Sequence, residues 1–282
     1  MKRVAFAIPG DLESPTGGYG YDRRMIAELR RLGWRVDVIA LGDGFPRPTD
    51  AQRAHALDIL DAVPDGVPIL IDGLAFGVLP EAASSLRTPH RLIALVHHPL
   101  ALETGISQHE VTGLRASERA ALQSSWHVVV TSATTRRMLI NDYEIGANKI
   151  SIARPGTERV FVEPRAPNEA VQLIAVGSIV PRKGYDVLIA ALAHLKGLAW
   201  YLSIVGDPVL SPDTTTALRG AIVRYAMSDK ISVLGRVSEA HLSALYASSD
   251  VFVLASHFEG YGMAYAEAIA HGLPVVLSLI HI

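Results

Sequence analysis

Two glutamates near the end of the chain, Glu259 and Glu267, carry the strongest chemical signal in the sequence. They lie eight positions apart within residues 256–276 (SHFEGYGMAYAEAIAHGLPVV), and apolar runs stand on both sides of this segment. Eight helical residues span roughly 12 Å, so the two carboxylates are too far apart to share one proton as a close dyad. We therefore expect them to contact two different parts of one elongated ligand.

A short glycine-rich stretch, Gly260-Tyr261-Gly262, stands between the two glutamates and precedes a predicted helix. Glycine has no Cβ, which lets the backbone come close to a ligand. The first N–H groups of the following helix have no partner within the helix, and the positive end of its dipole lies at the same place. The order strand, glycine loop, helix, turn, strand therefore predicts an anion site, most simply for a phosphate.

The segment from Glu259 to Glu267, with Gly-Leu-Pro-Val-Val behind it, resembles the E-x7-E signature of retaining GT-B glycosyltransferases of family 4, the group 1 glycosyl transferases. The resemblance implies that Glu259 is a catalytic residue beside the donor sugar and that Glu267 holds the ribose of the nucleotide. It also places Gly260, Tyr261 and Gly262 in the donor-binding loop. The alternative is a buried strand-loop-helix with two solvated glutamates.

A basic pair, Arg182 and Lys183, follows the apolar run at residues 171–177 and precedes Gly184. A guanidinium binds two oxygens at once and an ammonium supplies a mobile point charge, so the pair suits a diphosphate. The stretch resembles the phosphate-binding segment of the same family, with Lys183 in register. Ser178 stands where the family commonly has an arginine, and we expect Arg182 to supply that charge. The alternative is an exposed basic turn.

Near the start of the chain, Gly17 and Gly18 follow the first apolar run and precede a predicted helix over residues 21–32. This glycine loop resembles the family loop that faces the diphosphate and the acceptor, although a plain flexible loop is also compatible. The stretch is not a dinucleotide fingerprint, because Arg23 stands where a third glycine or alanine belongs.

His97 and His98 end the apolar run at residues 92–96. The resemblance implies that His97 approaches the donor sugar near its 6-position as a second catalytic residue, with His98 as the runner-up. A structural histidine is the alternative. We expect no metal site here, because adjacent histidines point apart on an extended chain and no third ligand has a regular spacing.

The composition of the 282 residues is that of a globular enzyme, with 49% hydrophobic and 19% charged residues. A net charge of −2 argues against a general nucleic-acid binder. The absence of cysteine excludes disulfides and thiolate chemistry, and with no signal-peptide pattern or apolar span it favours a cytoplasmic location. Peripheral contact with a membrane is compatible with this composition.

Short apolar runs alternate with helix-like segments along the whole chain, which predicts buried parallel strands with crossover helices. A proline-containing stretch at residues 155–169 interrupts the alternation and is typical of a linker. We therefore predict an α/β fold with two doubly wound Rossmann-like domains facing a cleft, which the resemblance identifies as GT-B. Residues 1–165 form the acceptor-side domain and residues 166–276 the nucleotide-sugar domain. The strand runs are residues 4–8, 36–41, 69–71, 92–96, 127–131, 150–153, 171–177, 200–205, 231–234, 251–254 and 274–276.

The last six residues, 277–282, read as the translation of a transposon end used in sequencing libraries. We expect them not to belong to the natural protein, and the second domain to be incomplete. A natural apolar tail is the alternative.

The resemblance implies a retaining transfer of a sugar from a nucleoside-diphosphate sugar to a hydroxyl acceptor, which is a sugar, a lipid or another alcohol, and we expect this transfer to be metal-independent. The nucleotide sugar acts as co-substrate and no further cofactor is expected. No Asp-x-Asp motif occurs that would bridge a metal to the diphosphate, and the basic pair and loop N–H groups would stabilise the leaving group. A non-catalytic fragment of such an enzyme and an NAD-dependent oxidoreductase are the alternatives.

Overall fold

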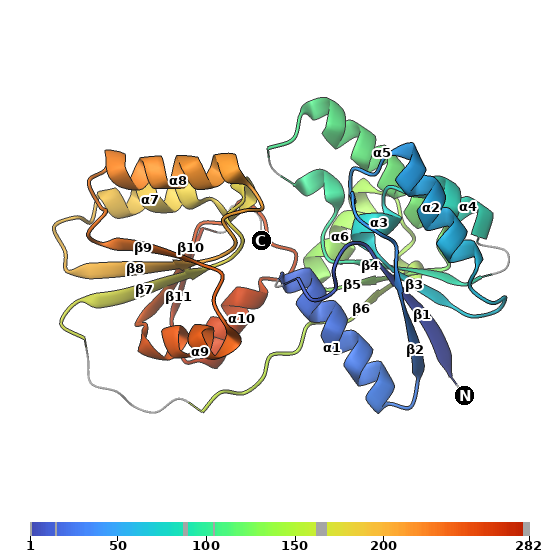
Figure 1. Ribbon diagram of the computed structural model, residues 1–282, viewed down its shortest axis with the longest axis horizontal. Helices are drawn as coiled ribbons and strands as arrows, with labels where there is room; N and C mark the ends of the chain where they lie inside the picture. The colour runs from blue at the N-terminus through green and yellow to red at the C-terminus, as the bar shows by residue number, and fades with distance from the viewer. Residues whose placement is uncertain (1, 15, 87–89, 104, 162–167, 279–282) are drawn as a thin grey trace. The chain divides into compact units, whose positions relative to one another are not determined.

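The computed structural model describes residues 2–14, 16–86, 90–103, 105–161 and 168–278. The chain divides into two compact units, Met1–Pro155 (unit 1) and Gly156–Ile282 (unit 2), each with a sheet and helices (Figure 1). The domain boundary expected between residues 165 and 166 falls within residues 162–167, which lie outside the described residues.

Unit 1 alternates strands and helices from its first described residues onward. Its elements are β1 (Arg3–Ile8), α1 (Gly17–Arg31), β2 (Arg35–Ala40), α2 (Asp50–Asp61), β3 (Ile69–Asp72), α3 (Gly73–Phe76), α4 (Pro80–Leu86), β4 (Leu92–Val96), α5 (Gln108–Ser124), β5 (His127–Val130), α6 (Ala133–Asp142) and β6 (Ile150–Ile152).

The sheet of unit 1 is parallel, with the strand order β2-β1-β3-β4-β5-β6. Successive side chains of a strand point to opposite faces of the sheet. Ala5 and Ala7 of β1 accordingly enter a buried cluster that includes Leu60 of α2 and Leu122 of α5. The chain leaves β1 toward β2 on one side and later returns to β3 on the other. This reversal places a switch point, where such folds bind ligands, at the carboxyl ends of β1 and β3.

Unit 2 also alternates strands and helices, and it has a hydrophobic core of its own. Its elements are β7 (Val171–Val176), α7 (Tyr185–Ala193), β8 (Trp200–Val205), α8 (Pro212–Arg224), β9 (Ile231–Gly235), α9 (Glu239–Ser248), β10 (Val251–Leu254), α10 (Met263–Ala270) and β11 (Val275–Leu277).

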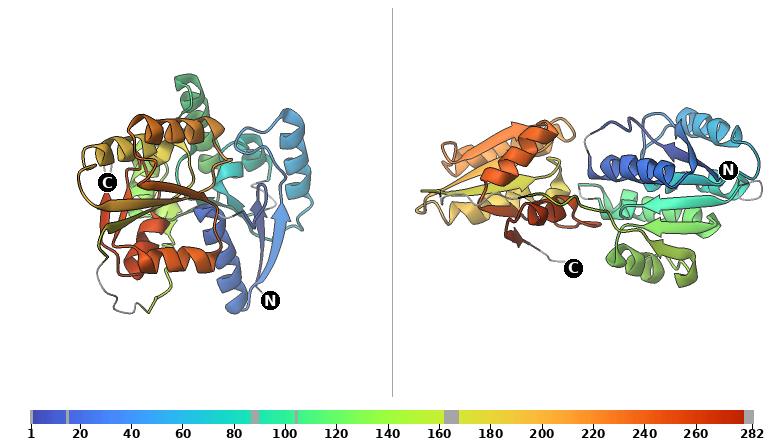
Figure 2. Two further views of the ribbon diagram at one scale, coloured as in Figure 1. Left: turned by 60° about the vertical axis from the view of Figure 1, so that its left-hand side comes forward. Right: turned by 90° about the horizontal axis from the view of Figure 1, so that it is seen from below.

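The sheet of unit 2 is also parallel, in the order β11-β10-β7-β8-β9. Helices α7 and α8 cover one face and α9 and α10 the other (Figures 1 and 2). Large apolar side chains from both layers, including Tyr246 of α9 and Phe252 of β10, fill the core. The switch point of this sheet lies between β7 and β10, so the loops that follow these two strands leave the sheet side by side.

The predicted strand runs all form strands, and their bounds differ from the predicted ones by no more than a residue at either end. The predicted start of the first helix is wrong: α1 begins at Gly17 and not near residue 21, because the Thr16 side chain caps the helix by accepting a hydrogen bond from the Tyr19 N–H. Leu277, which we assigned to the terminal tail, pairs with Leu254 in β11. Residues 279–282 lie outside the described residues.

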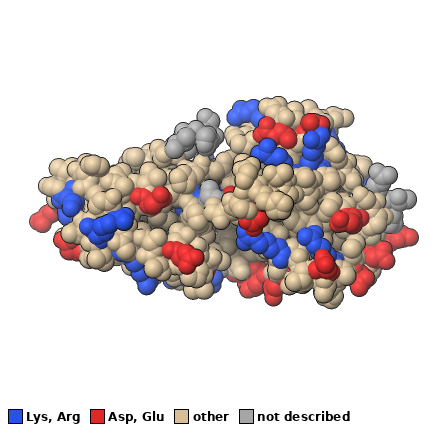
Figure 3. Space-filling model, turned by 90° about the horizontal axis from the view of Figure 1, so that it is seen from above, with Lys and Arg blue, Asp and Glu red and all other residues tan. Residues whose placement is uncertain are grey.

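Among the described residues, no helix combines the length and the apolarity that crossing a bilayer requires. Acidic and basic side chains are interspersed over the face of the molecule shown in Figure 3, with broad uncharged areas between them. This mixture agrees with the small net charge of −2.

Candidate active site

The two loops that leave the switch point of unit 2 contact each other along their backbones. The N–H of His257 donates to the carbonyl of Arg182 at 2.8 Å, and Nη1 of Arg182 donates to the carbonyl of Phe258 at 3.0 Å. Gly184 separates the basic loop from α7 with φ of +61°, and a Cβ at this position would lie 1.9 Å from the carbonyl oxygen of Ala255. The loops are therefore packed backbone to backbone.

This packing brings Lys183 and Glu259 together, although they are 76 residues apart in the sequence. Nζ of Lys183 lies 2.6 Å from Oε1 of Glu259, and the two side chains are only 12% and 10% exposed. Nη1 of Arg182 lies 3.6 Å from the other carboxylate oxygen. Ser256 donates its hydroxyl hydrogen to Glu259 Oε1 at 2.6 Å, and the hydroxyl of Tyr265 lies 3.4 Å away.

The charge state of Glu259 follows from these neighbours. Burial acts to raise the pKa of this carboxyl, but the positive charges of Lys183 and Arg182 outweigh it, so the pKa lies below its ordinary value. Glu259 is therefore ionised at neutral pH, and it holds two cations beside the ends of β7 and β10. A diphosphate bound here would compete with Glu259 for the same cations.

Two helices begin at this place without a capping side chain. Gly184 precedes α7 and Gly262 precedes α10, both in the left-handed conformation, and neither helix start receives a side-chain hydrogen bond. The N-terminal N–H groups of both helices are thus available to an anion. Gly260 and Tyr261 lie in the loop just before Gly262, and Tyr261 is exposed.

Glu267 lies on α10, about one and a half turns beyond Gly262. The buried Tyr246 of α9 donates its hydroxyl hydrogen to Glu267 Oε2 at 3.3 Å, and the ring of His271 stacks on that tyrosine with the centroids 4.7 Å apart. The hydrogen bond from Tyr246, a core residue of unit 2, therefore fixes the orientation of the Glu267 side chain. Glu259 lies in the loop before α10 and Glu267 lies within α10, which begins only at Met263. The stretch between the two glutamates is therefore only partly helical, and not helical over all eight positions as expected.

Unit 1 holds a second group of polar side chains at the switch point of its own sheet. His97 follows β4, and its Nε2 lies 3.1 Å from Asp22 Oδ1 of α1 and 3.2 Å from Asp72 Oδ2 at the end of β3. Gly18, in the first turn of α1, packs against the same imidazole: a Cβ at this position would lie 3.5 Å from its Cδ2. Gly17 is the first residue of α1 and is exposed.

The neighbouring His98 points to a different partner, since its Nε2 lies 3.3 Å from Glu103 Oε2. The two histidines thus face different groups, as their adjacency predicts. Sequence reasoning missed Asp22 and Asp72, although one signal was present: Asp72 is the polar residue that ends an otherwise apolar strand, Ile-Leu-Ile-Asp. Tyr246 and Ser256 were missed because both resemble ordinary core residues in the sequence.

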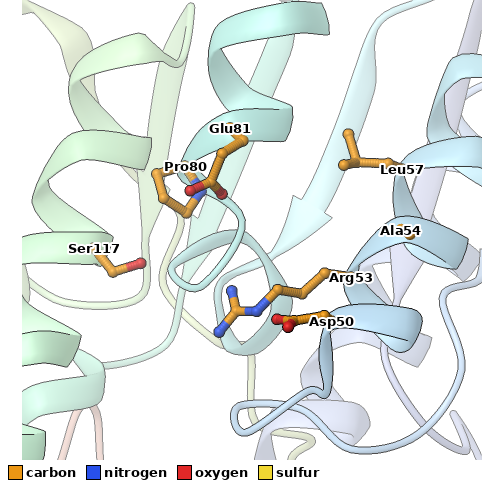
Figure 4. A pocket seen from close by; sticks show the side chains of 7 residues that line it. All are labelled: Asp50, Arg53, Ala54, Leu57, Pro80, Glu81 and Ser117. Carbon is orange, nitrogen blue, oxygen red and sulfur yellow. The ribbon is translucent and has the colours of Figure 1, made fainter.

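A further hollow on unit 1 is unrelated to either group. Residues of α2, α4 and α5 line it, namely Asp50, Arg53, Ala54, Leu57, Pro80, Glu81 and Ser117 (Figure 4). Arg53, which reaches into this hollow, is bonded to the carbonyl of Val78. None of the site residues expected from the sequence lines the hollow, and we assign it no function.

A comparison with known families shows which family the sequence of unit 2 is similar to. Residues 157–281 match the family model of the glycosyl transferases group 1. That stretch contains the basic loop and both glutamates of unit 2.

Relatives and solved structures agree with this match. The mannosylfructose-phosphate synthase of Agrobacterium fabrum is 28% identical over 54% of this chain and 37% of its own length. The MMP alpha-(1->4)-mannosyltransferase of Mycolicibacterium hassiacum is 27% identical over 66% of this chain and 48% of its own. The chain thus spans less than half the length of these two relatives.

Among solved structures, the sucrose-phosphate synthase of Thermosynechococcus elongatus superposes with a TM-score of 0.79 at 19% identity, over 98% of this chain and 81% of that one. HepE of Anabaena, solved with UDP and glucose, gives a TM-score of 0.66 at 18% identity, over 97% and 80% of the two chains. The fold of two Rossmann-like units is therefore the GT-B fold, as the sequence predicts.

We predict that Lys183→Met destabilises unit 2 by about 2–3 kcal/mol, because it leaves Glu259 charged and poorly exposed with only Arg182 nearby. Adding Glu259→Gln to the same chain is expected to restore most of that loss, since the uncompensated charge is then gone. Urea unfolding followed by the fluorescence of Trp200, the one tryptophan of unit 2 in the sequence, measures both. A double variant no more stable than Lys183→Met would refute the charge argument.

Proposed function

We propose that this chain is part of a retaining, metal-independent glycosyltransferase that uses a nucleoside-diphosphate sugar as its donor. One observation carries the proposal: Arg182, Lys183 and the uncapped starts of α7 and α10 meet at the switch point of unit 2. Cations and free N–H groups at one place suit a diphosphate. The group 1 glycosyl transferase model over the same residues supports this interpretation.

The two glutamates take separate roles in this proposal. Glu267, held by Tyr246, accepts hydrogen bonds from the ribose hydroxyls, and Glu259 lies by the sugar. When a diphosphate enters, Lys183 and Arg182 turn from Glu259 to the phosphate oxygens. Glu259 is then released to face the positive charge that develops on the sugar ring.

The chemistry we propose follows from these positions. The bond between the anomeric carbon and the diphosphate oxygen breaks, and the negative charge on the leaving group is stabilised by Arg182, Lys183 and the helix N–H groups. The acceptor hydroxyl attacks from the same face, and the leaving phosphate takes its proton. Retention of configuration follows from the same-face attack. Glu259 acts by its charge and position and not as a nucleophile.

For the base of the donor, the transferred sugar and the acceptor, we propose chemical classes and no single compound. HepE of Anabaena was solved with UDP and glucose, which makes a uridine nucleotide the first donor to try. The acceptor is a hydroxyl on a sugar, a lipid or another alcohol. His97 remains a predicted contact of the transferred sugar.

We expect Glu267→Ala to weaken nucleoside-diphosphate binding by about 1–3 kcal/mol, the range for hydrogen bonds to a charged group. Isothermal titration of wild type and variant with UDP, GDP and ADP gives the affinities. Tyr246→Phe is the matched control: it removes only the hydroxyl that orients Glu267 and should cost less. A folded Glu267→Ala variant with unchanged affinity for each nucleotide would remove Glu267 from the site.

Titration of the wild-type chain with the same three diphosphates and with NAD distinguishes a sugar-nucleotide site from a dinucleotide site. A wild-type chain that binds none of the three diphosphates but binds NAD would favour an oxidoreductase and overturn the proposal. A wild-type chain that binds one of them and, with the matching sugar nucleotide, releases that diphosphate when an acceptor is added would support it.

A further inference from the structure

Three polar side chains of unit 1 converge on one point at the carboxyl ends of β3 and β4. Nε2 of His97, just after β4, lies 3.1 Å from Oδ1 of Asp22 on α1 and 3.2 Å from Oδ2 of Asp72 at the end of β3. One ligand atom from each of these residues lies within 4.8 Å of the other two. An imidazole nitrogen and two carboxylate oxygens from three separate elements therefore meet at one place.

The hydrogen atoms available at this place are too few for the acceptors. Nε2 of an imidazole carries at most one hydrogen, yet it faces two carboxylate oxygens at nearly equal distances. The second oxygen of Asp22, Oδ2, has no hydrogen-bond partner among the described residues, although Asp22 is 0% exposed. A buried carboxylate is costly unless a donor or a positive charge compensates it. The described part of the chain compensates Asp22 only in part.

The carboxyl of Asp22 also adjoins that of Asp72. The two are close enough for a hydrogen bond when one of them is protonated. Burial raises the pKa of Asp22 to about 6, the hydrogen bond and charge of His97 oppose this rise, and the charge of Asp72 adds to it. Two carboxylates at this spacing repel each other when both are ionised. A divalent cation between them would remove that repulsion and give Asp22 the partner that it lacks.

The ligand set is that of a zinc site with an open position. Zn²⁺ binds imidazole nitrogen at about 2.0–2.1 Å and carboxylate oxygen at about 2.0–2.2 Å, and three protein ligands leave a fourth position for water or another ligand. Tetrahedral bonds of this length separate neighbouring ligand atoms by about 3.3–3.5 Å. The observed 3.1 and 3.2 Å need to open only slightly, and the 19% exposure of the His97 side chain gives access from solvent.

Neighbouring groups hold the three side chains in this arrangement. Oδ1 of Asp72 accepts a hydrogen bond from the Leu74 N–H at 2.7 Å, which leaves Oδ2 to face the imidazole. The His97 carbonyl accepts a hydrogen bond from the Thr131 hydroxyl at 3.1 Å, and the ring of Tyr21 packs edge-on against the imidazole with the centroids 5.4 Å apart. Outer contacts of this kind orient metal ligands, so the ligand atoms are largely in place before an ion binds.

We propose that Asp22, Asp72 and His97 form a binding site for a divalent transition-metal ion, Zn²⁺ first among them, with Nε2 and one oxygen of each carboxylate as ligands. The sequence predicts no metal here because no third ligand has a regular spacing, whereas these ligands come from three elements that only the fold brings together. All three belong to unit 1, so the metal site and the donor site proposed for unit 2 stand or fall separately.

A proton competes with the metal ion for Nε2. Burial acts to lower the pKa of His97, but the hydrogen bonds and charges of Asp22 and Asp72 outweigh it and raise the pKa to about 10. Metal binding must therefore release a proton from the imidazole, so the affinity is measured at about pH 8, where the competition is weaker than at neutral pH.

The test is an isothermal titration of Zn²⁺ into the whole chain, produced without a histidine tag and freed of metal beforehand. We expect one ion per wild-type chain. His97→Gln, Asp22→Asn and Asp72→Asn should each weaken binding by at least about tenfold, since the loss of an outer contact alone costs that much. His98→Gln is the matched control and should leave the affinity unchanged, because His98 has a carboxylate of its own, with Nε2 3.3 Å from Glu103 Oε2.

A wild-type chain that binds no Zn²⁺ overturns the site. Folded variants at the three ligands that bind Zn²⁺ as tightly as the wild type overturn it too, because the ion then lies elsewhere. Mg²⁺ should bind far more weakly than Zn²⁺, since imidazole suits zinc and not magnesium. Equal affinities for the two ions would contradict a site with a histidine ligand.

X-ray absorption at the zinc edge tests the ligand set without any variant. The zinc-loaded wild type should show one imidazole, with oxygen atoms as the other ligands. The sequence contains 11 histidines, so an adventitious zinc ion would gather histidine side chains at the surface. A spectrum with two or more imidazoles around the zinc would therefore overturn the site at Asp22, Asp72 and His97.

Discussion

Replacement of Gly184 by alanine is expected to destabilise unit 2 by more than about 3 kcal/mol, in the range reserved for severe backbone conflicts. A Cβ at this position would lie 1.9 Å from the carbonyl oxygen of Ala255 and 2.8 Å from the carbonyl carbon, and φ is +61°. Neither atom belongs to a flexible side chain, so α7 and the end of β10 must separate. That movement would also part Lys183 from Glu259.

The control for this substitution is Gly220→Ala, in the middle of α8 of the same unit. A Cβ there meets no heavy atom within 4 Å, and alanine is the better helix former by up to about 1 kcal/mol. We therefore expect Gly220→Ala to be neutral or slightly stabilising in urea unfolding followed by Trp200 fluorescence. Equal stability of the two variants would mean that the close approach at Gly184 does not constrain the fold.

We expect Glu118→Gln to remove a steep pH dependence from the stability of unit 1. Glu118 of α5 is 1% exposed. Its Oε2 accepts a hydrogen bond from the Leu100 N–H at 3.0 Å, and the hydroxyl of the buried Tyr143 lies near the carboxyl. Burial raises the pKa of this carboxyl from 4.5 to about 8. The folded protein therefore keeps a proton that the unfolded chain has already released above pH 4.5.

The direction of this pH dependence follows from the number of protons that Glu118 binds in the folded and in the unfolded state. Between pH 4.5 and about 8 the unfolded state binds fewer protons at this group than the folded state does, so the free energy of unfolding falls by about 1.4 kcal/mol per pH unit as the pH rises. The contribution is fully present below pH 4.5 and lost by about pH 8. Glutamine can still accept the hydrogen bond of Leu100, but it has no proton to lose, so the variant gains on the wild type as the pH increases.

Unfolding at pH 5, 6, 7 and 8, followed by Trp126 fluorescence, measures this difference. Glu110→Gln on the same helix is the control, because the hydrogen bonds from Ser107 hold the pKa of that exposed carboxyl below its ordinary value. Its contribution is lost only as the pH falls through that lowered pKa, so this variant should show the wild-type slope from pH 5 to 8. Parallel curves for wild type and Glu118→Gln would refute a neutral buried carboxyl.

The central strands, such as β1 and β4, could be predicted from the sequence because they are apolar runs in a sheet buried on both faces. The edge strand β2 contains Asp37 and is exposed at alternate positions, but its branched apolar residues still mark it as a strand. The start of α1 could not be predicted, because two glycines in its first turn have low helix propensity and only the Thr16 cap marks the helix. Helix propensity thus did not predict the start of α1, because the Thr16 hydroxyl determines it.

Some residues of the candidate site could likewise be located from the sequence, and others could not. The position of Lys183 and Glu259 in loops at strand ends was predictable, because each adjoins a glycine in a stretch that follows an apolar run, and Arg182 directly precedes Lys183. The arginine expected by family likeness at Ser178 is absent, and the structure places Arg182 beside Glu259. Asp22 could not be linked to His97, because a helix residue gives no sign in the sequence of which strand end it faces across 75 positions.

The long sequence separation of both groups has a consequence for how the protein is made. Lys183 meets Glu259 across 76 residues, and β7 acquires its neighbour β10 only after β8 and β9 have been synthesised. Parallel pairings of such high contact order form late in folding, because the loop must close before any contact stabilises it. A ribosome-bound chain that ends before residue 259 cannot hold this pair. Under the proposed function, nucleotide binding by a nascent chain would therefore report that β10 has paired with β7, and a bound nucleotide would protect slowly exchanging amides of unit 2.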